Sequence, residues 1–257
     1  MANKYTLLKV AENEIGYLEK KDKNNLNNKI ENAGHENYTK YAEECFPELQ
    51  GLSWCCMFIW WCFEKTFGKI MARNLIGEKT AKCSVMKDRM VDIGCKVVDI
   101  DFCELGDIVF FKNSFNNICH VGIISGHNLL NINTIEGNTL KAKDILVSNG
   151  GGVYSKTYQK NNKRIACIIR PKWELLEHEK QLDEMLENTK YNAEIKATNV
   201  NIRTGAGTDN PKIGMETLGF KFQIIGEDFD SFGIKWYKFK YKNQDAFIRS
   251  DFINIKK

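Results

Sequence analysis

All nine cysteines of this 257-residue chain lie before Pro171, and none lies after it. Such a break in composition indicates a boundary between two folding units, since each unit fills its core from its own stretch of sequence. The length suits two domains, and an apolar content of 43% is enough to fill a core in each. We therefore expect domains at residues 1–172 and 193–257, joined by a helical linker over residues 173–192, where Leu and Met recur at helical spacing.

Charge and hydropathy exclude several classes of partner. A net charge of +4 falls short of the concentrated basic patch of a nucleic-acid-binding protein, so we expect no nucleic-acid partner, although mild basicity suits an anionic bacterial wall. No run approaches the roughly 18 uninterrupted apolar residues that a membrane span needs, so we expect no membrane insertion. Charged residues interrupt the first 21 positions where a signal peptide would be apolar, which predicts synthesis in the cytoplasm without a leader.

The first domain reads as helices followed by strands. Apolar residues recur at helical spacing over residues 5–18, 35–46, 53–67 and 80–94. Strand-like runs then begin at Asp107, His120, Leu129, Val153 and Arg164. This order predicts an α+β fold with an antiparallel sheet.

The second domain shows a different pattern. From residue 193 onward, short alternating runs are separated by glycines. Alternation over a few residues with frequent turn signals is typical of a small all-β barrel. We therefore expect such a barrel over residues 193–257.

Cys55 is a candidate nucleophile. It follows Ser53 at the predicted start of an apolar helix, where unpaired backbone N–H groups and the helix dipole favour a thiolate. The ordinary alternative is a buried structural cysteine, and Cys56 is a rival whose side chain points about 100° away around the helix. Position alone leaves these interpretations open.

A base for the thiol must come from only four histidines. His120 opens an apolar strand directly after a loop, which places its imidazole at a sheet end where it can face a helix start. One strand further along, Glu136 and Asn138 are positioned to hold the imidazole in its useful tautomer. The sequence predicts that these side chains meet.

Together these motifs resemble the CHAP family, cysteine, histidine-dependent amidohydrolases/peptidases with a papain-like fold found in phage endolysins and bacterial autolysins. The resemblance covers roughly residues 5–170 and rests on three motifs in the correct order. They are SWCCMFIWWCF, GDIVFF with HVGII, and TIEGNT. The combination is specific, although each motif alone is weak.

The resemblance implies roles for individual residues. By matching position it assigns the nucleophile to Cys55 rather than Cys56, the base to His120 and the orienting carboxylate to Glu136, with Asn138 as a supporting polar group. It implies no cofactor, and we expect no required metal.

Two features near the nucleophile depend on local sequence. Relatives often carry a polar residue three positions before the cysteine, but Leu52 stands there. The oxyanion hole would then use the Cys55 backbone N–H, with the Gln50 side chain as a weaker candidate. Trp54, next to the nucleophile, is our predicted substrate contact in this domain.

The C-terminal segment resembles bacterial SH3 domains, which in such enzymes bind wall peptide. The resemblance rests on NVNIRTGAGTDNPKIG, WYKFKY and AFIRSDFI, within residues 193–257. It implies that Trp236, Tyr237 and Tyr241 contact the wall, although alternation along the strands assigns about half of the aromatic side chains to the core.

The expected function is hydrolysis of a peptidoglycan amide bond by a monomer, as an N-acetylmuramoyl-L-alanine amidase or an endopeptidase. We expect it to reach the wall by holin-dependent release or non-standard export. The alternatives are an NlpC/P60-type wall peptidase, an inactive wall-binding protein, and a cysteine-rich redox or metal protein. An NlpC/P60 enzyme usually has a DCSG-like helix start, which this chain lacks.

Overall fold

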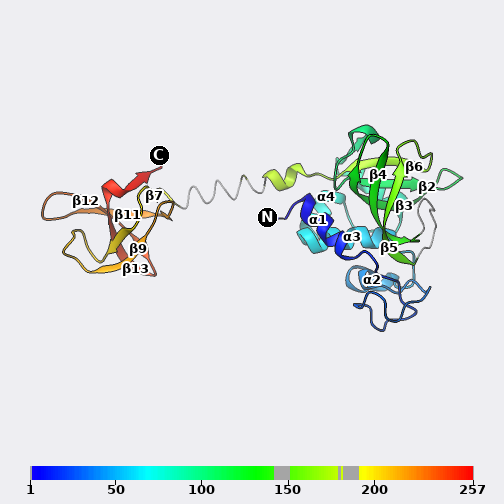
Figure 1. The fold of residues 1–257 in the computed structure, drawn as a ribbon, viewed down its shortest axis with the longest axis horizontal. Coiled ribbons are helices and arrows are strands. Elements are labelled where there is room, and N and C mark those ends of the chain that lie inside the picture. Colours follow the sequence, from blue (N-terminus) through cyan, green and yellow to red (C-terminus); the bar gives the residue numbers. More distant parts are fainter. Residues whose placement is uncertain (1, 142–150, 179–180, 182–190, 257) are drawn as a thin grey trace. The chain divides into compact units, whose positions relative to one another are not determined.

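The computed structural model describes residues 2–141, 151–178, 181 and 191–256 (Figure 1). The chain divides into two compact units, Met1–Glu177 and His178–Lys257. The first residues of the predicted linker belong to the larger unit, because Trp173 stacks on Phe63 with ring centroids 5.8 Å apart. Residues 179–180 and 182–190 of that linker lie outside the described residues.

Helices form the first half of the larger unit. They are α1 (Lys4–Asn13), α2 (Lys40–Cys45), α3 (Cys55–Phe67), α4 (Lys69–Ile76) and α5 (Cys83–Asp92). The side chains of Asn3 and Thr39 accept backbone N–H groups at the starts of α1 and α2, which satisfies donors that a helix start leaves unpaired. Gly68, with a φ of 77°, ends α3 as the sequence predicts, but α4 follows at once and was not predicted.

An antiparallel sheet forms the second half. Its strands are β1 (Lys96–Val98), β2 (Ile108–Lys112), β3 (Ile118–His127), β4 (Asn131–Thr139), β5 (Gly152–Gln159) and β6 (Ile165–Arg170), in the order β1-β6-β2-β3-β4-β5. Strand β1 was not predicted. Helices followed by antiparallel strands confirm the predicted mixed α+β class.

The sheet is apolar on both faces, which explains the unbroken apolar run of β2. Ile108 and Phe110 pack into the core that the helices share, whereas Val109 and Phe111 pack into a second cluster with Tyr158. Because successive strand residues point to opposite faces, a strand buried on both sides has no polar positions. Helix α3 contacts β3 and β4, and this packing positions the site described below.

Over residues 191–256, the smaller unit is built of strands and one short 3-10 helix. The strands are β7 (Ala193–Ile195), β8 (Val200–Arg203), β9 (Lys212–Glu216), β10 (Lys221–Phe222), β11 (Ile224–Phe229), β12 (Lys235–Tyr241), β13 (Gln244–Arg249) and β14 (Ile253–Ile255). They form two antiparallel sheets, ordered β10-β7-β14 and β11-β12-β13-β8-β9, around a shared apolar core. The predicted all-β character of this segment is confirmed, but no pairing among these strands closes either sheet into a complete barrel.

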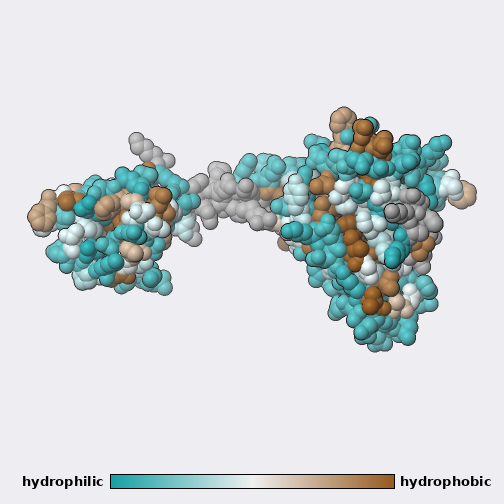
Figure 2. All heavy atoms as spheres, in the orientation of Figure 1, coloured by the Kyte–Doolittle hydropathy of each residue, from teal (hydrophilic) through white to brown (hydrophobic). Residues whose placement is uncertain are grey.

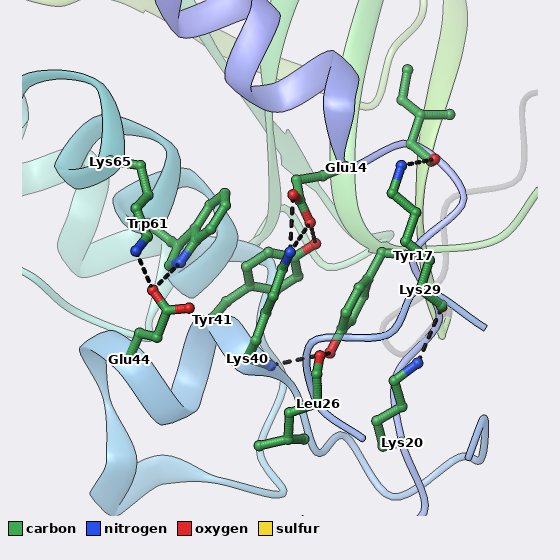
Figure 3. A network of polar contacts seen from close by, with 11 residues as sticks. Glu14, Tyr17, Lys20, Leu26, Lys29, Lys40, Tyr41, Glu44, Trp61 and Lys65 are labelled. Carbon is green, nitrogen blue, oxygen red and sulfur yellow. Dashed lines mark hydrogen bonds and ion pairs between the residues drawn. The ribbon is translucent and has the colours of Figure 1, made fainter. Parts of the chain in front are cut away.

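Polar contacts fasten α1 and α2 to the loop between them (Figure 3). The carboxylate of Glu14 accepts the Tyr41 hydroxyl at 2.6 Å and lies 2.8 Å from the Lys40 ammonium. Tyr17 accepts the Lys40 backbone N–H and donates its hydroxyl to the carbonyl of Leu26. Since these groups are largely buried, each contact satisfies a polar atom that would otherwise be costly to bury.

The visible face of each unit is mostly hydrophilic, with smaller hydrophobic patches (Figure 2). Several large apolar side chains are exposed at strand turns, including Phe115 and Leu129. Among the described helices, none combines the length and apolarity required to cross a bilayer.

Candidate active site

Cys55 is the first residue of α3. Trp54 occupies the N-cap position and makes no side-chain capping bond, so the first backbone N–H groups of the helix have no partner within it. The helix begins two residues later than Ser53, the start that the sequence suggested. The Cys55 side chain is only 4% exposed, which places the sulfur at a helix start in largely desolvated surroundings.

His120 lies on β3 and is held from behind by a buried carboxylate. Its Nε2 is 2.9 Å from Glu136 Oε2 on β4. Because a carboxylate only accepts hydrogen bonds, Nε2 carries the proton, and Nδ1 is the ring nitrogen left to face Cys55. Glu136 also accepts the hydroxyls of Thr134 at 2.5 Å and Tyr158 at 3.2 Å, so this completely buried carboxylate has three donors.

Two glycines let these groups approach each other. A Cβ on Gly122 of β3 would lie 2.7 Å from Glu136 Cγ. A Cβ on Gly137 of β4 would lie 2.6 Å from Phe58 Cβ on α3 and 2.8 Å from the Trp54 ring. All three distances are shorter than side chains tolerate, so glycine at these positions sets how closely β3, β4 and α3 pack.

The electrostatics of the site favour a thiolate beside an imidazolium. Side-chain hydrogen bonds with Cys56, Cys83 and His120 hold the pKa of Cys55 well below its usual range, although burial opposes this shift. Burial alone would lower the pKa of His120, but hydrogen bonds to Cys55 and Glu136 outweigh it and raise this pKa to about 10. At pH values between the lowered pKa of Cys55 and the raised pKa of His120, Cys55 is the anion and His120 is the cation.

Sequence reasoning missed the third cysteine of this site. Cys83, at the start of α5, has its sulfur 3.5 Å from that of Cys55 and 3.2 Å from that of Cys56. All three sulfurs lie within 4.8 Å of one another. The bonds with Cys55 raise the pKa of both Cys56 and Cys83, so these two keep their protons when Cys55 ionises. No CxxC spacing signalled this cluster, because it joins residues 28 positions apart.

Asn138 is completely internal and sits next to the carboxylate in sequence. It is 1% exposed and has a φ of 56°, in the left-handed region that Asn tolerates better than most residues. It lies in an irregularity of the β4–β5 pairing between Glu136 and Thr139. Asn138 is thus part of strand β4, and the distortion of the strand explains why an asparagine follows Gly137.

Gln50 is not placed as an oxyanion donor. Its amide oxygen accepts the Thr39 backbone N–H at 3.0 Å, and its Nε2 donates to the Thr39 carbonyl and to Glu43. Both ends of the amide thus hold the start of α2. Of the two candidates that the sequence suggested, the Cys55 backbone N–H remains, at the open start of α3.

Three of the four predicted binding aromatics are buried. Trp54 is 0% exposed and donates its indole N–H to Glu19 at 2.9 Å, so it supports α3 from inside rather than contacting a substrate. In the smaller unit, Trp236 and Tyr241 are buried. The Trp236 indole N–H donates a hydrogen bond to Asp230, and the Tyr241 hydroxyl donates one to Glu216. Tyr237 alone is partly exposed. Trp236, although buried, lines a cavity of the smaller unit together with Arg203 and Arg249, and wall binding by these aromatics stays a prediction.

A surface cavity of about 570 Å³ is lined by residues that are close in sequence to Cys55 and Cys83. Its lining includes Ser53 and Lys82, which lie two residues before Cys55 and one before Cys83. Lys79 and Arg89 add positive charge that outweighs the one carboxylate, Glu48, and Leu52 adds an exposed apolar side chain. The cavity is therefore cationic with an apolar part, a lining that attracts anionic groups on peptides.

Comparison with known proteins gives little further information. A scan against models of protein families finds no match, and a search of curated proteins finds none either. Two solved structures are similar over 96% of this chain and 92% of theirs: "The crystal structure of Ly7917", at 12% identity and a TM-score of 0.41, and "The crystal structure of Ly7917 with the hydrolyzing product of MDP", at 11% and 0.40. Similarity this weak carries no argument about the fold or function of this chain.

Proposed function

We propose that the chain is a peptidoglycan hydrolase whose larger unit, of the papain-like CHAP type, cleaves an amide bond. The observation that supports this proposal is the line of groups from Cys55 through His120 to Glu136. A thiol at a helix start, an imidazole hydrogen-bonded to it and a buried carboxylate behind the imidazole are the parts that nucleophilic amide hydrolysis requires.

The proposed reaction has two stages. The Cys55 thiolate attacks the amide carbonyl and forms a C–S bond, and the C–N bond breaks as His120 gives its proton to the leaving amine. His120 then takes a proton from water, which attacks the thioester and releases the carboxylic acid and the thiolate. Glu136 stabilises the imidazolium, and the Cys55 backbone N–H stabilises the oxyanion.

We propose that the cavity beside Ser53 and Lys82 receives the peptide stem of the wall polymer. Stem peptides carry free carboxylates, and Lys79, Lys82 and Arg89 supply complementary charge. The smaller unit, of the bacterial SH3 type, would raise the local concentration of the enzyme on the wall. A route to the wall by holin-dependent release or non-standard export belongs to the same proposal.

The direct test is release of soluble fragments from purified bacterial walls. Cys55→Ala should reduce release by at least about 10⁴-fold, because it removes the nucleophile. Cys62→Ala is the matched control, since Cys62 is buried two turns later on the same helix and contacts no other group of the site that we describe. Fragment release by Cys55→Ala at the wild-type rate would refute the proposal. Mass spectrometry of the fragments would identify the bond.

A further inference from the structure

The three-sulfur cluster at the start of α3 is more than one nucleophile needs. Cys55 and Cys56 come from α3, and Cys83 comes from the first position of α5. The sulfur–sulfur distances of 3.2 and 3.5 Å from Cys83, and the limit of 4.8 Å over all pairs, describe a compact triangle. It is the only group of three such side chains with converging ligand atoms among the described residues.

The size of the triangle matches a single metal ion. Zinc–sulfur bonds are about 2.3 Å, so sulfurs bound to one tetrahedral zinc lie roughly 3.8 Å apart. The two separations from Cys83, 3.2 and 3.5 Å, are slightly shorter than that value, so small adjustments of side chains would open the triangle around an ion. Thiolates select soft or borderline ions such as Zn²⁺ and Cd²⁺ over Ca²⁺ and Mg²⁺, which prefer oxygen.

The triangle has a route to solvent. Cys83 is 7% exposed, and Lys82 beside it lines the surface cavity together with Ser53. Cys55 and Cys83 each keep a small exposed surface that an ion could reach, whereas Cys56 is completely buried. Three thiolates leave a fourth position for water, as expected of an accessible site rather than a closed structural one.

We infer that Cys55, Cys56 and Cys83 form a binding site for one thiophilic divalent metal ion. On binding, three metal–sulfur bonds form, and each sulfur that was protonated loses its proton to solvent. The ion is bonded to the Cys55 sulfur, which can then no longer attack a substrate. If the proposed function holds, bound Zn²⁺ therefore inhibits hydrolysis reversibly, and a chelator restores it; the metal site itself does not depend on that function.

The test uses the full chain, kept reduced and freed of metal. Titration with Cd²⁺ should produce a thiolate-to-metal charge-transfer absorption band that saturates at one ion per chain, and Zn²⁺ should displace the Cd²⁺. Cys83→Ser should weaken binding by about 100-fold or more, since one of three ligands is lost. Cys167→Ser is the matched control, because Cys167 is a partly exposed cysteine on β6 outside the cluster, and it should bind as the wild type does.

A measurement on the wild type guards against misfolding of the variant. Zn²⁺ should protect Cys55, Cys56 and Cys83 from alkylation, read by peptide mapping, while leaving Cys167 reactive. Absence of the absorption band, or equal weakening by Cys167→Ser, would overturn the inference. Metal binding without any wall hydrolysis would support the metal site and refute the proposed function. Wall hydrolysis that Zn²⁺ does not inhibit, together with no absorption band, would support the proposed function and refute the metal site.

Discussion

At the scale of single residues, Glu136 determines what His120 can do. Its carboxylate accepts hydrogen bonds from the imidazole, from Thr134 and from Tyr158, and it is completely buried. A buried anion with three donors is stabilised in place, so it fixes both the tautomer and the orientation of the ring. Neither Thr134 nor Tyr158 was predicted, because each reaches the carboxylate from a strand position that sequence patterns mark only as half-buried.

Glu136→Gln should lower kcat for wall hydrolysis by about 10²–10⁴-fold. The pKa of His120 is raised to about 10 by Cys55 and by Glu136, and the amide keeps the shape of the Glu136 side chain but removes its charge, so that pKa should fall. NMR titration of the His120 ring measures the shift independently of activity. Tyr158→Phe, which removes only one donor, should cost far less; an unshifted ring in Glu136→Gln would contradict the role.

The thiolate form of Cys55 should persist well below the pH at which an ordinary thiol ionises. Its pKa is lowered, so reactivity is lost only as pH falls through that lowered value, and imidazolium is lost as pH rises past about 10. Hydrolysis measured as kcat/KM should therefore be bell-shaped. The rate of Cys55 alkylation, followed by peptide mapping, reports the acid limb; a midpoint near the free-thiol pKa of about 8.5 would show that the ion pair does not form.

At the scale of elements, the site depends on how closely α3 packs against β3 and β4. Gly122 and Gly137 remove the side chains that would separate these elements. The pattern of the sequence predicted α3 and the β2–β3 hairpin because both are long apolar runs. It predicted neither α4 nor β1, since short elements carry too few residues to show a period.

Gly137→Ala should lower the free energy of unfolding of the larger unit by about 1–3 kcal/mol, because its Cβ overlaps Phe58 and Trp54. Movement of β4 from α3 should also slow alkylation of Cys55. Thermal unfolding and the alkylation rate measure the two effects. Gly126→Ala on β3 is the matched control, since its Cβ would meet only the Asn133 side chain and come no closer than 3.2 Å to it. Equal stability of the two variants would show that the close approach of Gly137 to Phe58 and Trp54 does not determine how β4 packs on α3.

Sequence patterns reveal the parts of the site that lie at the ends of long apolar runs, but not the parts that depend on how helices pack. Cys55, His120 and Glu136 lie at recognisable starts and ends of apolar runs, so their proximity was predictable, although their catalytic roles stay predictions. The approach of Cys83 to Cys55 was not predictable, because it depends on how α5 packs against α3. Burial of Trp54 likewise follows from packing against Glu19, a residue 35 positions away.

At the scale of the whole molecule, the chain consists of two units with separate cores. The core of the larger unit runs from Leu7 to Ile169 and includes Trp173 at its edge, whereas that of the smaller unit starts at Ala193. No buried residue is shared between these clusters. Each unit should therefore fold without the other, and the two proposed activities should be separable.

A chain ending at Glu177 should keep the reactivity of Cys55 and lose most of its affinity for walls. The boundary leaves the packing of Trp173 on Phe63 intact, so the thermal unfolding of the larger unit should be unchanged. Cosedimentation with purified walls compares the shortened and full chains, and alkylation of Cys55 serves as the control for folding. Equal cosedimentation of the two would assign wall binding to the larger unit instead.

The enclosed carboxylate of Glu136 has one more consequence. In water, every gain or loss of a proton by an imidazole forces the surrounding dipoles to turn, and that rearrangement adds to the barrier. Around His120 the dipoles are hydroxyls attached to β4 and β5, already pointing at the anion. The rearrangement is thus completed once, while the chain folds, and need not be repeated in each cycle of proton transfer.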